Sequence, residues 1–162
     1  MRAAILTVSS SVARGDNEDR SGAELAQRAR AAGAEIAAQD VVADDRAAIE
    51  GWLRARVADG VDLIFTTGGT GLTEDDVTPE ATQAVIQRDA PGFAEAMRAE
   101  SARRTPTGIL TRGASGIAGR TLIINFPGSP KAIGELFSVI EPALGHAVDT
   151  LRRPPGEPTP GH

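Results

Sequence analysis

Cysteine is absent from the 162 residues, and the only histidines are His146 and His162. Without cysteine, disulfide bonds and thiolate metal sites are excluded. A Ser-His-Asp triad would have to use His146, and no nucleophile-elbow motif accompanies it. No apolar run is long enough to span a membrane or to form the core of a signal peptide. These absences favour a soluble protein of a reducing compartment, and we expect it to be cytoplasmic.

Aromatic residues make up 3% of the chain, and Lys131 is its only lysine. The apolar load falls on alanine, valine, isoleucine and leucine, which suits small helices packed on a sheet of branched aliphatic side chains. The formal net charge of -5 argues against nucleic acid as an electrostatic partner. The length suits one domain, which we assign to residues 1–153, and a flexible Pro- and Gly-rich tail at 154–162.

Predicted strands and helices alternate along the chain. The expected strands are 2–8, 36–42 and 61–65, followed by a hairpin of 105–112 and 119–126 joined at 113–116. The expected helices are 21–33, 45–57, 79–88, 93–103 and a last one after Pro130, in which Pro142 would cause a kink or a split. This order predicts an α/β fold of three layers, α/β/α, with a mostly parallel mixed sheet and one antiparallel strand near an edge.

The most informative stretch leads from a buried strand into Thr66-Thr67-Gly68-Gly69-Thr70-Gly71 and then into a helix beginning near Pro79. A glycine-rich turn between a strand and a helix lets backbone N–H groups converge on an anion. Acidic residues follow directly, and neighbouring carboxylates are costly to hold together unless a cation lies between them. The stretch therefore indicates a site that binds a phosphate group together with a metal ion. Neither the Walker motif nor the dinucleotide fingerprint is complete, and a bare tight turn is the alternative.

Further unusual loops follow the other predicted parallel strands. They are Ser9–Ser11 after the first strand, Asp44 after the second and Pro127–Lys131 after the last. In open α/β sheets, ligands bind beyond the carboxyl ends of the strands. We therefore expect these loops and the glycine turn to form one composite site.

Five motifs occur in order along the chain: Asp19–Gly22, Thr66–Gly71, Asp76–Thr82, Pro91–Phe93 and Leu122–Ala132. Together they resemble the molybdenum cofactor biosynthesis family that contains MogA, MoaB and the G domain of gephyrin, over about residues 3 to 150. The resemblance implies a three-layer fold that assembles as a homotrimer or a hexamer. It also implies adenylylation of molybdopterin, in which the terminal phosphate attacks the α-phosphorus of Mg-ATP and pyrophosphate leaves. A partner enzyme would then insert molybdate.

The resemblance assigns Asp44 and Asp76 as the catalytic acids and as ligands of Mg²⁺. Each has an acidic neighbour, Asp45 or Asp75, and the choice between Asp44 and Asp45 is open. Thr111 stands where many members carry a serine that contacts the pterin phosphate. The residues expected to bind nucleotide and pterin are Ser9, Gly68, Gly69, Thr70, Gly71, Thr111, Pro127, Gly128, Ser129 and Lys131.

Simpler roles compete with these assignments. Asp44 could be a helix N-cap, and Asp76 could complement a helix dipole. Lys131 could solvate a surface turn, and Arg112 could contact phosphate or form a surface ion pair. Three functions compete: a MogA-like adenylyltransferase, a MoaB-like relative with weaker or different catalysis, and a non-catalytic pterin- or nucleotide-binding scaffold. The acids at Asp44 and Asp76 favour the first over the third.

Overall fold

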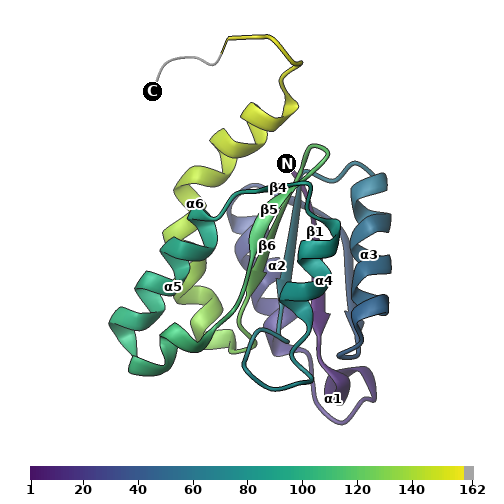
Figure 1. Ribbon diagram of the computed structural model, residues 1–162, viewed down its shortest axis with the longest axis vertical. Coiled ribbons are helices and arrows are strands. Elements are labelled where there is room, and N and C mark those ends of the chain that lie inside the picture. Colours follow the sequence, from purple (N-terminus) through teal and green to yellow (C-terminus); the bar gives the residue numbers. More distant parts are fainter. Residues whose placement is uncertain (159–162) are drawn as a thin grey trace.

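The computed structural model describes residues 1–158, which form a six-stranded sheet with helices on both faces (Figure 1). The strands are β1 (Arg2–Val8), β2 (Glu35–Val42), β3 (Leu63–Thr67), β4 (Arg88–Asp89), β5 (Ser115–Ala118) and β6 (Thr121–Phe126). Their spatial order is β2-β1-β3-β6-β5-β4. The pairs from β2 to β6 are parallel, whereas β5 runs antiparallel to both β6 and β4. The predicted mostly parallel sheet with an antiparallel strand near one edge is confirmed.

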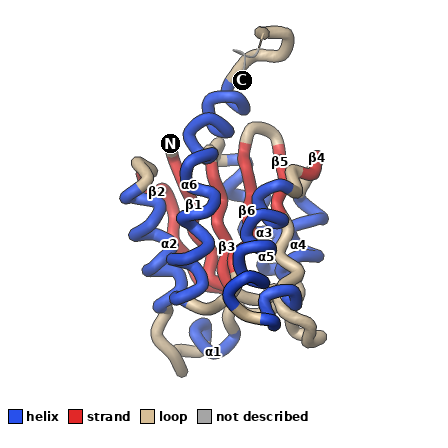
Figure 2. Tube along the Cα trace, turned by 90° about the vertical axis from the view of Figure 1, so that its left-hand side faces the viewer, coloured by secondary structure: helices blue, strands red, loops and turns tan. Residues whose placement is uncertain are grey.

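The helices form the two outer layers of the fold. They are α1 (Ser10–Ala13), α2 (Arg20–Ala31), α3 (Arg46–Ala58), α4 (Thr78–Val85), α5 (Gly92–Arg104), the 3-10 helix η1 (Pro106–Leu110) and α6 (Pro130–Arg152). Helices α2, α5 and α6 lie on one face of the sheet, and α3 and α4 lie on the other (Figures 1 and 2). Pro142 lies inside α6 and does not split it. In residues 1–158, no helix combines the length and apolar character needed to cross a bilayer.

Alternating side chains of the buried strand β3 supply both halves of the core. Phe65 packs with Phe126 and Phe137 under α6, at ring-centroid distances of 5.8 and 5.6 Å. The intervening Ile64 faces the other way and packs in the cluster that includes Ile49 and Leu53 of α3. Each large apolar side chain buried in this way contributes about 1.5–3 kcal/mol. The sheet is thus held on both faces, which fixes the positions of its strand ends.

The predicted strand at 105–112 is wrong, because this segment forms η1 instead. Pro106 begins the 3-10 helix, and Gly108 packs directly against the backbone of α5, where an added Cβ would lie 2.3 Å from the Ser101 carbonyl carbon. The antiparallel strand is β5, a few residues later. The hairpin turn is correspondingly not at 113–116 but at Gly119 and Arg120, where Ala118 pairs with Thr121.

Other elements and boundaries also differ from the sequence prediction. Helix α4 ends at Val85 rather than at residue 88, and Arg88–Asp89 forms the short edge strand β4. The polar segment after β1 contains the one-turn helix α1, and β3 extends to Thr67. Residues 154–158 contain neither helix nor strand. The rest of the predicted tail, 159–162, lies outside the described residues, so the predicted domain boundary stays a prediction.

Candidate functional site

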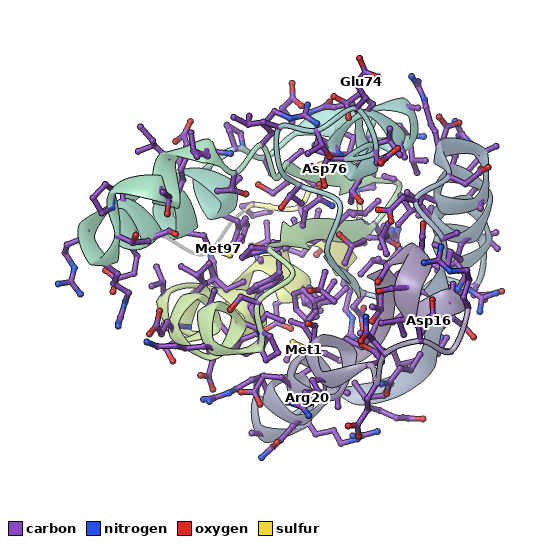
Figure 3. The ribbon with its side chains drawn as sticks, turned by 90° about the horizontal axis from the view of Figure 1, so that it is seen from below. Met1, Asp16, Arg20, Glu74, Asp76 and Met97 are labelled. Carbon is purple, nitrogen blue, oxygen red and sulfur yellow. The ribbon has the colours of Figure 1, made fainter. Side chains whose placement is uncertain are left out.

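The loops that follow β1, β2, β3 and β6 lie at one end of the sheet, together with residues 111–114, which precede β5. We call this end the carboxyl rim; it is at the bottom of Figure 1, where α1 lies. Figure 3 shows it from below, with Asp76 on one side of the strand ends and Asp16 and Arg20 on the other. The predicted site residues come from these loops.

The glycine turn after β3 runs between the end of β1 and the start of α4. Gly68 and Gly69 have φ values of +93° and +64°, which residues with a Cβ rarely adopt. A Cβ on Gly68 would lie 2.3 Å from the Val8 carbonyl oxygen, and one on Gly69 would lie 2.3 Å from Thr78 Oγ1. Both backbone conformation and space therefore require glycine here.

The carbonyl groups of this turn are bound, which orients the turn from several sides. Gly68 O accepts from Thr78 Oγ1 at 2.9 Å, and Gly69 O accepts from Thr78 N at 3.1 Å. Thr70 O accepts from Arg112 N at 2.8 Å. The N–H groups of Gly69 and Thr70, by contrast, have no protein acceptor within residues 1–158. These two donors are therefore available to an anionic ligand.

Asp76 lies at the end of the loop that follows the glycine turn. Its Oδ2 accepts hydrogen bonds from Thr73 N at 3.0 Å and Thr73 Oγ1 at 2.7 Å. Burial raises the pKa of the Asp76 carboxyl, but hydrogen bonds from Thr73 and Gly71 and the charge of Arg112 outweigh it and leave the pKa below its usual value. Asp76 is therefore an anion at neutral pH.

Asp44 reaches the same turn from the loop after β2. Its Oδ2 accepts from Ser10 N at 3.0 Å and Ser10 Oγ at 2.9 Å. A Cβ on Gly69 would lie 3.4 Å from Asp44 Oδ1, and one on Gly71 would lie 2.7 Å from Asp76 Oδ2. The two carboxylates thus approach glycines two positions apart in one turn.

The structure distinguishes Asp44 from Asp45. Asp45 is exposed and accepts a hydrogen bond from Ala48 N at 2.8 Å, so it is the N-cap of α3. The alternative that Asp44 caps this helix is wrong, because its carboxylate binds Ser10 instead. Asp75 is likewise exposed, whereas Asp76 is half-buried beside Gly71.

A cavity of about 530 Å³ lies on the β1 side of the glycine turn. Of the predicted binding residues, Ser9, Gly68 and Gly128 line it. Its other lining residues are Thr7, Val8, Ser11, Val12, Asn17, Glu18, Asp19, Arg20, Ser21, Thr67 and Pro130. The cavity therefore joins the glycine turn to the segment at 17–21, which the sequence prediction did not place among the binding residues.

Asp19 is the main residue of this cavity that the prediction missed. Its Oδ2 accepts from Thr7 Oγ1 at 2.8 Å, and its Oδ1 accepts from Gly22 N at 2.8 Å as the N-cap of α2. A Cβ on Gly22 would lie 2.3 Å from Asp19 Oδ2. The Asp-Arg-Ser-Gly motif was the available signal, since it combines a capping acid with a glycine three positions later.

The loop after β6 contributes backbone groups to the cavity. Pro127 O accepts from Thr67 Oγ1 at 2.8 Å, and Gly128 O accepts from Ser21 Oγ at 2.5 Å. Ser129 is the N-cap of α6, accepting from Ala132 N at 3.4 Å. Lys131 is exposed and lines a neighbouring groove with Glu24 and Arg28, so the structure does not bring it into the cavity.

Thr70 and Thr111 meet on the other side of the turn, with 3.4 Å between their hydroxyl oxygens. Asn125, which the prediction did not single out, lies buried beneath them. Its amide nitrogen donates to Thr66 Oγ1 at 2.9 Å and to Thr82 Oγ1 at 3.0 Å, and its oxygen accepts from Ala114 N at 3.0 Å. This one side chain therefore joins β3, α4 and the segment that carries Thr111.

The arrangement suits a hard divalent cation held jointly with a ligand. Within the described residues, no group of three or more acidic, histidine or cysteine side chains forms a ready metal cage. Asp44 and Asp76 supply two carboxylates, each already oriented by an N–H and a hydroxyl. Mg²⁺ characteristically binds through one or two carboxylates and completes its coordination with water and phosphate oxygens. The donor set therefore fits Mg²⁺ accompanied by a phosphate compound.

Comparison with known proteins identifies the family. The profile of the family described as "Probable molybdopterin binding domain" matches residues 4–146. The molybdopterin adenylyltransferase of Helicobacter pylori strain 26695 is 46% identical over 114 residues, which cover 69% of this chain and 64% of the relative. The chain therefore spans less than two thirds of that protein's length. Escherichia coli K12 molybdenum cofactor biosynthesis protein B is 40% identical over 146 residues, covering 88% of this chain and 85% of the relative.

Solved structures agree with the sequence comparison. The crystal structure of the molybdopterin biosynthesis enzyme MoaB from Thermus thermophilus superposes with a TM-score of 0.87 at 42% identity, covering 93% of this chain and 95% of the other. A MogA structure superposes with a TM-score of 0.88 at 39% identity, covering 93% and 99%. The chain belongs to the molybdenum cofactor biosynthesis family of MogA and MoaB.

Proposed function

We propose that this protein is a molybdopterin adenylyltransferase. The observation that carries the proposal is the approach of Asp44 and Asp76, from different loops, to one glycine turn, in which the N–H groups of Gly69 and Thr70 have no acceptor among residues 1–158. Transfer of an adenylyl group needs positioning and neutralisation of charge more than a covalent protein group. The described site offers carboxylates, hydroxyls and backbone donors, which suits that requirement.

The reaction forms one bond and breaks one. A terminal phosphate oxygen of molybdopterin attacks the α-phosphorus of ATP, the bond from that phosphorus to the bridging oxygen breaks, and pyrophosphate leaves with the electron pair. Asp44 and Asp76 would hold Mg²⁺, which, when bound, neutralises phosphate charge. The N–H groups of Gly69 and Thr70 would bind phosphate oxygens, and hydroxyls such as Thr111 would orient the pterin phosphate.

The cavity beside Ser9 and Asp19 and the hydroxyls of Thr70 and Thr111 lie on opposite sides of the glycine turn. We assign one substrate to each, so that their phosphates meet over the glycine turn. Ser129 would act as the N-cap of α6 and Pro127 through its backbone carbonyl. Lys131 would contribute only long-range charge from its neighbouring groove. We further propose that the protein works in the cytoplasm as a homotrimer or hexamer and passes its product to a molybdate-inserting enzyme.

The test is incubation of the purified protein with molybdopterin and Mg-ATP, followed by measurement of pyrophosphate and adenylylated molybdopterin. Both products should appear in equal amounts, and omission of molybdopterin or chelation of Mg²⁺ should abolish them. Binding of molybdopterin without pyrophosphate formation would overturn the proposal. It would support the second candidate, a MoaB-like role, which the longer match to the Escherichia coli protein B favours.

A further inference from the structure

Arg112 makes two hydrogen bonds to the acidic loop of residues 71–76 and an ion pair with the helix that follows it. Its Nε donates to Gly71 O at 2.7 Å, and one terminal nitrogen donates to Asp76 O at 2.7 Å. The other terminal nitrogen donates to the Glu80 carboxylate in α4. One guanidinium therefore binds the first residue of the loop, the last residue of the loop and the helix that follows.

The loop bound by Arg112 has little other support. Leu72 is 64% exposed, and Glu74 and Asp75 are exposed as well. Its internal hydrogen bonds join Asp76 to Thr73 and to Gly71. A segment with few buried contacts and solvent-exposed hydrogen bonds opens at low free-energy cost. The contacts of Arg112 at both ends are thus the main connection of the loop to the rest of the rim.

Hydrogen bonds from other elements fix the backbone on both sides of Arg112. Arg98 of α5 donates from Nε to Thr111 O at 2.9 Å and from a terminal nitrogen to Gly113 O at 2.8 Å. The Arg112 N–H donates to Thr70 O at 2.8 Å, which ties the same segment to the glycine turn. The guanidinium therefore extends from a backbone that is fixed on both sides.

We infer that Arg112 is a positioning residue, which holds the loop of residues 71–76 so that the Asp76 carboxylate faces the glycine turn. Each of its nitrogens donates to a protein acceptor, so the side chain is already occupied and does not need a phosphate partner. The hydrogen bond with Glu80 raises the pKa of Arg112 and lowers that of Glu80, so both remain charged. The planar fork is essential, because a lysine at this position could not bind three separated acceptors.

The role in adenylyl transfer rests on the proposed function, whereas the ordering of the loop does not. The test therefore uses two independent measurements on Arg112→Lys and on a matched control, Arg103→Ala. Arg103 lies on α5 in an exposed ion pair with Glu100, so its removal deletes an arginine without touching the rim. The first measurement is hydrogen–deuterium exchange of peptides that cover residues 70–77, without ligand. The second is kcat and KM for Mg-ATP.

In Arg112→Lys, amide exchange in residues 71–76 should rise at least about tenfold while exchange in β1 and α6 stays at the parent level. The kcat should fall by about 10- to 100-fold with a smaller change in KM, as expected when a catalytic group is misplaced. Arg103→Ala should match the parent in both measurements. Unchanged exchange in Arg112→Lys would overturn the inference, and a raised KM with unchanged exchange would assign Arg112 to phosphate contact instead. If the parent produces no pyrophosphate, the proposed function fails and the exchange result alone decides the inference.

Discussion

The loops that carry Asp44 and Asp76 orient their carboxylates with the same kinds of hydrogen bond, but the donor residues lie at different distances along the chain. In each, one carboxylate oxygen accepts from the N–H and the hydroxyl of a single residue, Ser10 for Asp44 and Thr73 for Asp76. Thr73 precedes Asp76 by three residues, whereas Ser10 lies 34 residues from Asp44. The position of Asp76 is thus set within a local turn, and that of Asp44 depends on the alignment of β1 with β2.

This difference determines what each acid needs from the rest of the fold. The Asp44 contact connects two neighbouring strand ends, so packing of the sheet maintains it. The hydrogen bonds between Thr73 and Asp76 are local, and the contacts of Arg112 connect this turn to the rest of the rim. The same carboxylate geometry is therefore held at Asp44 by the pairing of two strands. At Asp76 it is held by a local turn together with the contacts of Arg112.

The largest effect should come from neutralising either acid. Asp44→Asn and Asp76→Asn keep the shape of the side chain but remove its charge, and each should lower kcat for pyrophosphate formation by about 10²- to 10³-fold. The exposed neighbours provide matched controls: Asp45→Asn and Asp75→Asn should retain the parent rate, since asparagine caps a helix about as well as aspartate. A parent-like rate in Asp44→Asn together with a loss in Asp76→Asn would show that the two acids do not share a role.

Removing the hydroxyl that orients each acid should lower the free energy of unfolding by different amounts in the two loops. Ser10→Ala deletes a donor to Asp44 and the acceptor of the Asp44 N–H, and it should lower the free energy of unfolding by about 1–2 kcal/mol. Thr73→Ala deletes one exposed local bond and should cost about 0.5–1 kcal/mol. Urea unfolding curves measure both, with the exposed Thr107→Ala as the control. Equal losses would contradict the distinction between long-range and local support.

The smallest effect should appear in the pH dependence of stability. Because Asp76 has a lowered pKa in the folded protein, the unfolded chain takes up this proton more readily. The stabilisation is therefore complete above the unfolded pKa of about 3.9 and is lost as the pH falls through the lower folded value. The stability difference between the parent and Asp76→Asn should be constant from neutral pH to about pH 4 and narrow below it. Thermal unfolding across this range tests the expectation, and a difference that widens at low pH would contradict it.

The sequence allowed better prediction of the Asp76 loop than of the Asp44 loop for the same physical reason. The donors and glycine that orient Asp76 lie within five residues of it, so a local motif contains most of the information. The choice between Asp44 and Asp45 depends on Ser10, which no local pattern connects to either. Apolar runs predicted β1, β3 and β6, because a strand covered on both faces carries apolar side chains toward both layers.

Long-range packing also explains the failed prediction at 105–112. The segment has the composition of a short strand, but Gly108 allows it to lie against the backbone of α5, a contact that the sequence does not reveal. Lys131 illustrates the same limit, because its direction on α6 depends on how that helix packs beside α2. Local pattern located β1, β2, β3 and β6, but it located neither β4 and β5 nor the approach of separate segments.

The reversed direction of β5 has a consequence for how the rim is built. The parallel strands end at the carboxyl rim, so the chain leaves them there. The antiparallel strand β5 begins at the rim, so the segment before it lies there instead. Thr111 and Arg112 thus precede β5 at the rim, and after the two-residue connection at Gly119 and Arg120 the chain returns along β6, so that Pro127 also lies at the rim. The antiparallel direction of β5 thus brings two chain segments to the rim without the crossover helix that another parallel strand would require.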